Sequence, residues 1–206
     1  MSRQESVKMR GDLKLISPWI AEGTQVLDLG CGDGTLLAHL QASKHVLGYG
    51  VEIDETQITR CIEKGVNVIE HDLDQRGLYQ FADQQFDTVI MTQALQAVRR
   101  PDVMIDEMLR LGKQGVVTFP NFGHWRCRQY LSLRGKMPMS KTLPYTWFNT
   151  PNIHLCTFKD FEALCETKGI RIVNRMVVNE DFERHSFARM WPNLLAEFAV
   201  YRIERA

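Results

Sequence analysis

One stretch decides the fold of this chain: Val26-Leu27-Asp28-Leu29-Gly30-Cys31-Gly32-Asp33-Gly34-Thr35-Leu36-Leu37. An apolar run typical of a buried strand breaks into alternating glycines and continues as an apolar, helix-like segment. Glycine lets the backbone turn sharply and lets a ligand come close, because it has no Cβ. A helix that starts after such a turn presents unpaired N–H groups and the positive end of its dipole. The stretch therefore predicts a strand, a ligand-binding turn and a helix.

Strands and helices are predicted to alternate along most of the chain. The predicted strands are Gln25–Leu29, Val46–Ile53, Val66–Glu70, Phe86–Met91, Gln114–Phe119, Ile170–Val178 and Glu197–Ile203. The predicted helices cover residues 8–22 with a kink at Pro18, 35–41, 55–64, 102–111, 122–133, and a segment that begins with a capping-box pattern at Thr157. This alternation predicts an α/β Rossmann-like fold, in which a seven-stranded, mostly parallel sheet is flanked by helices.

Residues 121–151 interrupt this alternation after the fifth predicted strand. The segment is rich in aromatic, basic and proline residues, including Trp125, Trp147 and Phe148. We expect a long ordered loop over 136–150, and an insertion of about 121–151 in a single domain that spans residues 1–206. A lid over a ligand pocket and a surface for a partner protein both fit its aromatic side chains. A polar loop is predicted over 179–189.

The composition bounds the class of protein. Lys+Arg and Asp+Glu both number 25, so the chain has no net positive charge that would favour an anionic membrane. The basic, aromatic segment 124–150 could stack on single-stranded RNA, but the balanced charge argues against it, so neither a nucleic acid nor a membrane is a predicted partner. No apolar run approaches the roughly 20 residues of a membrane span, and the first residues lack the apolar core of a signal peptide. The five cysteines are scattered, without a Cys-x-x-Cys pair. This usage predicts a reducing, cytoplasmic location.

Three ligand classes use a strand–glycine–helix turn. A Walker P-loop requires Lys-Ser/Thr after its last glycine, whereas Gly34 is followed by Thr35-Leu36. A dinucleotide site has Gly-x-Gly-x-x-Gly, one residue longer than the spacing found here. The pattern Asp28-x-Gly30-x-Gly32-x-Gly34 instead resembles the first motif of the class I S-adenosylmethionine (SAM) methyltransferases. The acidic Asp28 suits the ammonium group of SAM, and the backbone N–H groups of the turn can bind its carboxylate.

Further candidates for a SAM (or S-adenosylhomocysteine) site follow the next two predicted strands. Parallel strands collect their carboxyl ends at one crevice, which is where ligands bind in such sheets. Glu52 can accept hydrogen bonds from both ribose hydroxyls, and Ile53 beside it can cover the adenine. The resemblance to methyltransferases implies that Asp72 binds the adenine amino group and that Leu73 provides a backbone donor. The alternative is a surface turn surrounded by solvated acids.

The predicted cofactor site also includes Cys31 in the turn and Thr92-Gln93 at the end of the fourth predicted strand. Cysteine is a frequent filler of this turn in class I methyltransferases, so we do not expect Cys31 to be catalytic. The small-molecule O-methyltransferases that the chain resembles often carry Glu-His where Gln96-Ala97 stand here, and neither of these two residues can act as a general base.

Two histidines follow the fifth predicted strand. His124 is a weak candidate for a catalytic base, although a packed structural histidine is an equal alternative, and His154 has the same standing. His124-x-x-Cys127 and His154-x-Cys156 also suggest a metal site. Zinc sites usually contain Cys-x2–4-Cys pairs, however, so no metal is predicted.

The central insertion carries a more specific resemblance than the glycine turn. Asn121-Phe122-Gly123-His124-Trp125, Gly135-Lys136-Met137-Pro138, Leu143-Pro144-Tyr145-x-Trp147 and Thr150-Pro151-Asn152-Ile153-His154 resemble the MetW family of bacterial methionine-biosynthesis proteins, as does Arg10-x-Asp12-Leu13. The resemblance covers the chain from about Arg10 to its C-terminus. It implies a Rossmann-like class I SAM-methyltransferase fold and a partner, the homoserine O-acyltransferase of methionine biosynthesis.

The sequence is therefore compatible with three functions. The first is a SAM-binding accessory or regulatory protein that supports homoserine O-acyltransferase, with either an acetyl or a succinyl donor. The second is an active SAM-dependent methyltransferase on an unknown small molecule, and the third is a dinucleotide-binding protein. The missing base at Gln96-Ala97 favours the first function.

Overall fold

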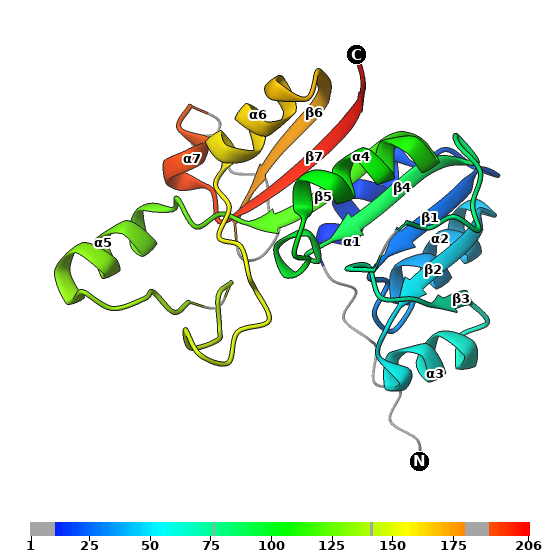
Figure 1. Ribbon diagram of the computed structural model, residues 1–206, viewed down its shortest axis with the longest axis horizontal. Helices are drawn as coiled ribbons and strands as arrows, with labels where there is room; N and C mark the ends of the chain where they lie inside the picture. The colour runs from blue at the N-terminus through cyan, green and yellow to red at the C-terminus, as the bar shows by residue number, and fades with distance from the viewer. Residues whose placement is uncertain (1–10, 76, 141, 180–189) are drawn as a thin grey trace.

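The computed structural model describes residues 11–75, 77–140, 142–179 and 190–206. A seven-stranded sheet with the order β3-β2-β1-β4-β5-β7-β6 forms its centre (Figure 1). Its strands are β1 (Gln25–Leu29), β2 (Leu47–Glu52), β3 (Asn67–Glu70), β4 (Phe86–Thr92), β5 (Gly112–Pro120), β6 (Ile170–Val178) and β7 (Phe198–Arg205). The strands β1 to β5 pair in parallel, whereas β7 runs antiparallel to both β5 and β6. The predicted seven-stranded, mostly parallel sheet is confirmed.

Helices surround this sheet. They are α1 (Gly11–Ile16), α2 (Thr35–Lys44), α3 (Glu55–Glu63), α4 (Pro101–Leu111), α5 (Trp125–Arg134), α6 (Phe158–Thr167) and α7 (Pro192–Leu195), with short 3-10 turns η1 (Ser17–Trp19) and η2 (Leu95–Ala97). Two helix starts follow directly from the sequence. Pro101 opens α4 at the position where a proline needs no hydrogen-bonded N–H. Thr157 and Asp160 form the predicted capping box at the start of α6.

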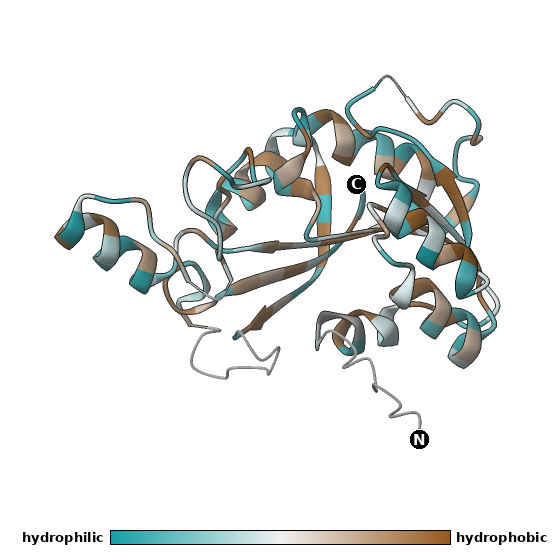
Figure 2. Cartoon of the chain, turned by 90° about the horizontal axis from the view of Figure 1, so that it is seen from below, coloured by the Kyte–Doolittle hydropathy of each residue, from teal (hydrophilic) through white to brown (hydrophobic). Residues whose placement is uncertain are grey.

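Two apolar cores lie on opposite faces of the sheet, and alternate residues of β1 belong to different cores. Leu27 and Leu29 pack into the core that contains α4 and α6 residues such as Met108 and Phe161. Val26 packs into the other core, which contains Leu37 of α2 and Cys61 of α3. This alternation is what a strand covered on both faces requires. Hydrophobic residues accordingly run along the strands in Figure 2.

The structure changes three details of the predicted elements. The leading helix ends at Ile16 and continues as the 3-10 turn η1 around Pro18, while residues 8–10 lie outside the described part of the chain. The helix predicted over 122–133 starts later, at Trp125. The short helix α7, which opens at Pro192, was not predicted. Within the polar loop predicted over 179–189, residues 180–189 lie outside the described part.

The insertion after β5 projects from the sheet as α5 and a long loop, residues 135–140 and 142–156, which contains no regular helix or strand, as predicted (Figure 1). Of the α5 residues, only Cys127 is buried. The insertion thus leaves the carboxyl end of β5 and extends away from the two cores.

Candidate functional site

The glycine turn connects β1 to α2 with three residues in the left-handed region. Gly30, Gly32 and Gly34 have φ angles of 72°, 55° and 73°. L-residues with a side chain rarely adopt this conformation. Two of the glycines also face close neighbours. A Cβ on Gly34 would lie 2.9 Å from the sulfur of Cys61, and a Cβ on Gly30 would lie 3.0 Å from the Cβ of Ala94. The turn therefore needs glycine for both conformation and space.

The backbone N–H groups of the turn are already used inside the protein. The N–H groups of Gly30 and Cys31 donate to the carbonyl of Val51, at 2.8 and 3.1 Å, and the N–H of Gly34 donates to the carbonyl of Cys31 at 3.1 Å. The expectation that these N–H groups bind the carboxylate of SAM is therefore wrong for these residues. Parallel pairing of β1 with β2 places Leu29 opposite Val51, which brings the turn against the end of β2.

Glu52 lies at the carboxyl end of β2 and is joined to the glycine turn. One carboxylate oxygen, Oε2, accepts a hydrogen bond from the N–H of Gly32 at 2.9 Å. The other, Oε1, accepts from the N–H groups of Ile53 and Asp54 at 2.8 and 3.1 Å. A carboxylate has about four acceptor positions, so three bonds orient this group and leave acceptor capacity for a ligand hydroxyl. Glu52 is thus a structural clamp as well as the predicted ribose ligand.

Two carboxylates, those of Asp28 and Glu52, lie next to the turn. Asp28 is only 1% exposed, directly before the turn. Burial raises the pKa of the Cys31 thiol far above its ordinary value, and the charges of Asp28 and Glu52 raise it further. Cys31 therefore stays a neutral thiol, as expected of a residue that fills space rather than reacts. The carboxylates of Asp28 and Glu52 attract a cationic ligand and repel an anionic one such as a pyrophosphate.

Thr92 and Gln93 follow β4 at the same edge of the sheet. Thr92 is buried, and Gln93 adopts φ 53°, an uncommon angle for a residue with a side chain. The N–H of Gln93 donates to the carbonyl and the hydroxyl of Thr118, at 2.9 and 3.1 Å, which holds this strained turn. The side chain of Gln96 donates to the carbonyl of Gln93 at 2.7 Å.

The part of the predicted SAM site that would bind adenine lies at the carboxyl ends of β2 and β3. Ile53 is 57% exposed, as expected of an apolar side chain that a ligand would cover. Asp72 accepts a hydrogen bond from the N–H of Asp74 at 2.9 Å, which shapes the turn around Leu73. Pairing of Glu52 with Glu70 in neighbouring strands brings the two segments side by side. The structure therefore places the glycine turn, Glu52, the 72–73 turn and the end of β4 at one edge of the sheet.

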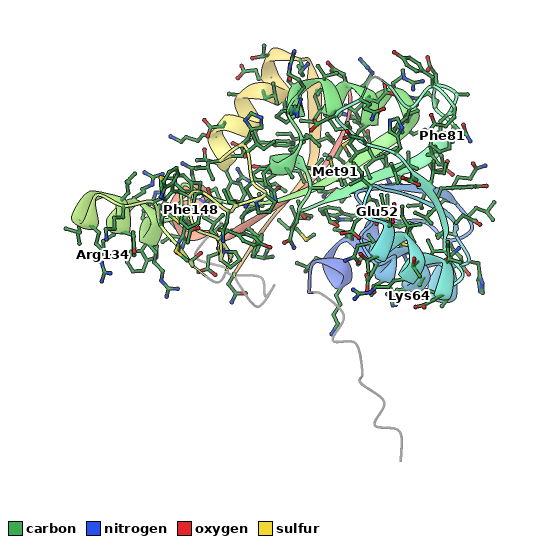
Figure 3. The ribbon with its side chains drawn as sticks, turned by 60° about the horizontal axis from the view of Figure 1, so that its bottom comes forward. Glu52, Lys64, Phe81, Met91, Arg134 and Phe148 are labelled. Carbon is green, nitrogen blue, oxygen red and sulfur yellow. The ribbon has the colours of Figure 1, made fainter. Side chains whose placement is uncertain are left out.

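Several residues near this edge were missed by the sequence analysis. Lys64, at the end of α3, donates to the carboxylate and the carbonyl of Asp33 at 2.6 and 2.8 Å, and to the hydroxyl of Thr35 at 2.8 Å. Figure 3 labels Glu52 and Lys64 on the same part of the molecule. A lysine at a helix end is common in any sequence, so no local signal marks this contact with the glycine turn.

A cavity of about 490 Å³ lies beside the predicted adenine end and was also not predicted. Its walls include His71, Leu73, Arg99 and Met104. The N–H of Arg99 donates to the carboxylate of Asp74 at 2.6 Å, which joins the start of α4 to the segment after β3. Of these lining residues, the sequence analysis predicted only Leu73.

His124 lies away from the glycine turn, at the start of α5. It is 6% exposed, and burial lowers the pKa of its imidazole below the ordinary value. Its ring lines a cavity of about 450 Å³ together with Cys127 and Tyr130 of α5 and Glu197. The ring of His154 contacts the carbonyl of Arg99 at 3.1 Å. The two predicted histidines therefore lie in different environments.

Neither a metal cluster nor a membrane-spanning helix is found in the described ranges 11–75, 77–140, 142–179 and 190–206. No group of three or more His, Cys, Asp and Glu side chains in them could hold a metal ion. No helix in them is long and apolar enough to cross a membrane.

Comparisons with known proteins agree with this geometry. A family model described as "Methionine biosynthesis protein MetW" matches residues 10–203. The chain is 32% identical over 208 residues to the bifunctional methionine biosynthesis protein MetXA/MetW of Rhodopirellula baltica, covering 97% of this chain and 33% of that relative. The chain thus spans about a third of the length of this relative. It is also 29% identical over 136 residues to a ubiquinone biosynthesis O-methyltransferase of Pseudomonas fluorescens, covering 61% of this chain and 58% of that one.

The solved structures define the fold. A TehB-like SAM-dependent methyltransferase from Corynebacterium glutamicum superposes with a TM-score of 0.62 at 16% identity, over 97% of this chain and 89% of that one. The sheet order and this superposition identify a Rossmann-like class I SAM-methyltransferase fold. The family model and the fused relative go further: the chain belongs to the MetW family of methionine biosynthesis proteins.

Proposed function

We propose that this protein binds SAM and acts as an accessory or regulatory protein of homoserine O-acyltransferase, rather than as a methyltransferase. The proposal rests on one observation, the neutral side chain of Gln96 at the position of a general base. This residue stands where related small-molecule O-methyltransferases often have a titratable Glu-His pair. Gln96 is 7% exposed, and its side-chain Nε2 donates to the carbonyl of Gln93. Its backbone carbonyl accepts from the N–H groups of Ile153 and His154 at 2.8 and 3.0 Å. A neutral side chain built into the backbone network occupies the place of the base.

The choice of partner rests on the fused relative. In that protein a MetXA part and a MetW part form one chain, and this chain aligns with a third of its length. Fusion keeps two modules at a high effective concentration, which is useful when they act together. We infer that MetXA is the homoserine O-acyltransferase and that separate chains of the two kinds also associate. Residues 1–206 are proposed to form one domain in the cytoplasm, where the methionine pathway operates.

SAM is the proposed ligand because of the site at the carboxyl ends of β1 to β4. Asp28 and Glu52 suit a cationic amino-acid sulfonium ligand, and Ile53 offers an exposed apolar surface for the adenine. SAM is made from methionine, so a site for it would sense the output of the pathway. By linkage, SAM would change the affinity of this protein for the acyltransferase by the same factor as the acyltransferase changes the affinity for SAM.

The test is a mixing experiment with the purified chain and the homoserine O-acyltransferase encoded in the same genome. Acylation of homoserine is followed with each acyl donor, acetyl-CoA and succinyl-CoA, with and without SAM. We expect a complex and a change in the acylation rate on addition of the chain. No complex and an unchanged rate would reject the proposal. Calorimetric titrations with SAM and NAD, side by side, separate SAM binding from dinucleotide binding.

The second candidate is an active methyltransferase that uses His124 as a base. It is supported by the similarity to the ubiquinone biosynthesis O-methyltransferase. Burial lowers the pKa of His124, and because this residue lies away from the glycine turn, the candidate requires an acceptor long enough to reach both. This candidate predicts formation of S-adenosylhomocysteine with some acceptor. It also predicts that His124→Ala abolishes this turnover while SAM binding remains.

A further inference from the structure

The insertion carries a local excess of positive charge that the balanced composition hides. Residues 121–157 contain five basic residues, Arg126, Arg128, Arg134, Lys136 and Lys141, and no Asp or Glu. Only 20 of the 25 Lys and Arg residues are left for the rest of the chain, which holds all 25 Asp and Glu residues. The insertion is therefore positive and the remainder of the molecule is negative.

The same segment exposes large apolar side chains. Leu133 and Trp147 are each 76% exposed, Phe148 is 71% exposed and Ile153 is 57% exposed. Figure 3 labels Arg134 on α5 and Phe148 nearer the body, both away from Glu52. We call the exposed side chains Leu133, Arg134, Lys136, Trp147, Phe148 and Ile153 the basic aromatic surface. Aromatic and arginine side chains of this kind dominate the energetics of protein interfaces.

A hollow of about 210 Å³ opens beside Trp147 and Ile153 of this surface. It is lined by Phe122, Met137, Tyr145, Trp147, Ile153 and Leu155, among others. Interface residues that contribute most to binding usually insert into such small apolar pockets on the partner. The hollow is therefore suited to one apolar side chain of a partner protein.

The part of the basic aromatic surface around Trp147 and Phe148 is held in shape by hydrogen bonds and a ring contact. Asn149 accepts through its side-chain oxygen from the N–H and the hydroxyl of Thr146, at 2.9 and 2.7 Å. The rings of Trp147 and Phe148 contact each other edge-on, with centroids 5.7 Å apart. An ordered surface loses little conformational entropy on binding, which favours its use as a docking site.

We propose that the basic aromatic surface binds an acidic face of homoserine O-acyltransferase that presents an apolar side chain to the hollow. The inference rests on the proposed function and adds the location and chemistry of the contact. The fused relative supports a protein partner, since it joins a MetW part to a second protein part in one chain. The positive charge of the segment favours an acidic partner face.

Three other occupants fit less well. A symmetric dimer through this surface would bring two positive segments together, which costs energy. A nucleic acid would leave aliphatic side chains such as Leu133 and Ile153 without a favourable contact, since it binds through stacking and phosphates. A membrane-surface helix needs one apolar stripe, whereas the exposed Leu131 and Leu133 of α5, two residues apart, lie on different faces.

Binding of the full chain to the purified acyltransferase is measured by calorimetry at two salt concentrations. For the double variant Trp147→Ala/Phe148→Ala we expect at least about a tenfold loss of affinity. For Arg134→Glu/Lys136→Glu we expect a loss of about threefold or more, larger at low salt than at high salt. The matched controls are Tyr79→Ala, another exposed aromatic, and Lys14→Glu, another exposed lysine, both outside the insertion. The controls should bind like the unmodified chain.

The possible results distinguish an error in the docking surface from an error in the proposed function. If the unmodified chain binds the acyltransferase and both double variants bind equally well, the surface is wrong and the proposed function stands. If the unmodified chain does not bind, both the docking surface and the proposed function are overturned.

SAM affinity and the urea unfolding midpoint show whether each variant is folded. Parallel titrations use a 20-nucleotide single-stranded RNA and phosphatidylserine vesicles. Binding to either that is lost in the variants, while acyltransferase binding persists, would assign the surface to that ligand instead.

Discussion

The carboxylate of Glu52 accepts a hydrogen bond from the backbone N–H of Gly32 at 2.9 Å, although the two residues are 20 positions apart. This bond ties the glycine turn after β1 to the end of β2. Both residues belong to the proposed SAM site, so the shape of the turn and the position of the ribose ligand depend on each other. Substitutions on either side of the contact should therefore affect stability and ligand binding together.

Glu52→Gln should weaken both the fold and SAM binding. Glutamine keeps one carbonyl oxygen, so either the Gly32 N–H or the pair from Ile53 and Asp54 loses its acceptor. We expect a loss of about 1–2 kcal/mol in the free energy of unfolding, because hydrogen bonds to a charged group are involved. SAM affinity should fall at least about tenfold. Urea unfolding and calorimetry measure the two effects, with the exposed Glu63→Gln on α3 as control. Unchanged SAM affinity would contradict the ribose role of Glu52.

Gly34→Ala should destabilise the protein more than the same change at Gly65. Both glycines have positive φ angles, 73° and 71°, so both variants pay the cost of the left-handed region, about 1–2 kcal/mol. A Cβ at Gly34 also meets the sulfur of Cys61 at 2.9 Å, whereas a Cβ at Gly65 meets nothing within 4 Å. The free energies of unfolding should differ by about 1 kcal/mol or more. Adding Cys61→Ala to Gly34→Ala should recover part of that difference. Equal losses in the two single variants would show that the turn relaxes freely.

Lys64→Met should lower stability near neutral pH and have less effect in acid. Burial opposes ionisation of Asp33, but hydrogen bonds from Lys64 and Thr35 outweigh it and hold the pKa of that carboxyl below its usual value. A lowered folded-state pKa stabilises the protein above the unfolded value, about 3.9, and this contribution is lost as the pH falls through the folded value. Because the pair is partly exposed, we expect a cost of about 1 kcal/mol or less at pH 7.

The measurement for Lys64→Met is urea unfolding at pH 7 and pH 3. The difference between the variant and the unmodified chain should shrink at pH 3, because the pH is then below the unfolded value of Asp33 and closer to its folded-state pKa. Lys113→Met, which removes a comparable ion pair with Asp87, is the control for SAM binding. A weaker affinity for SAM only in Lys64→Met would place the effect at the glycine turn. A difference that stays constant with pH would mean that the charge of Asp33 does not matter.

His124 should make the protein less stable in mild acid. Burial lowers the pKa of its imidazole, so below about pH 6.5 the unfolded chain takes up a proton that the folded protein does not. Stability then falls as the pH decreases from about 6.5 towards the folded-state pKa. His124→Gln should reduce the loss of unfolding free energy between pH 8 and pH 5. His39→Gln, on α2, controls for the removal of an imidazole. An identical pH dependence in His124→Gln and the unmodified chain would contradict this assignment.

Much of the fold could be predicted because its signals are local. The apolar runs of β1 and β4 and the helix start at Pro101 each depend on a few neighbouring residues, and their predicted places differ from the observed ones by at most a residue or two. The helix in the insertion begins at Trp125, three residues after its predicted start. Its sequence has little apolar pattern because few of its residues pack on the body, so its boundary had a weak local signal.

The sequence by itself determined the strand–turn–helix order, the need for glycine in the turn, and the resemblance to the MetW family. Only the tertiary structure decided that the N–H groups of Gly30 and Cys31 are bonded to Val51 and that Gly32 is bonded to Glu52. It also decided that the backbone carbonyl of Gln96 is bonded to residues 153–154, just after the insertion. The physical reason is that local conformation follows from adjacent side chains. The partner of a hydrogen-bonding group instead depends on strand register and on which distant segments pack side by side.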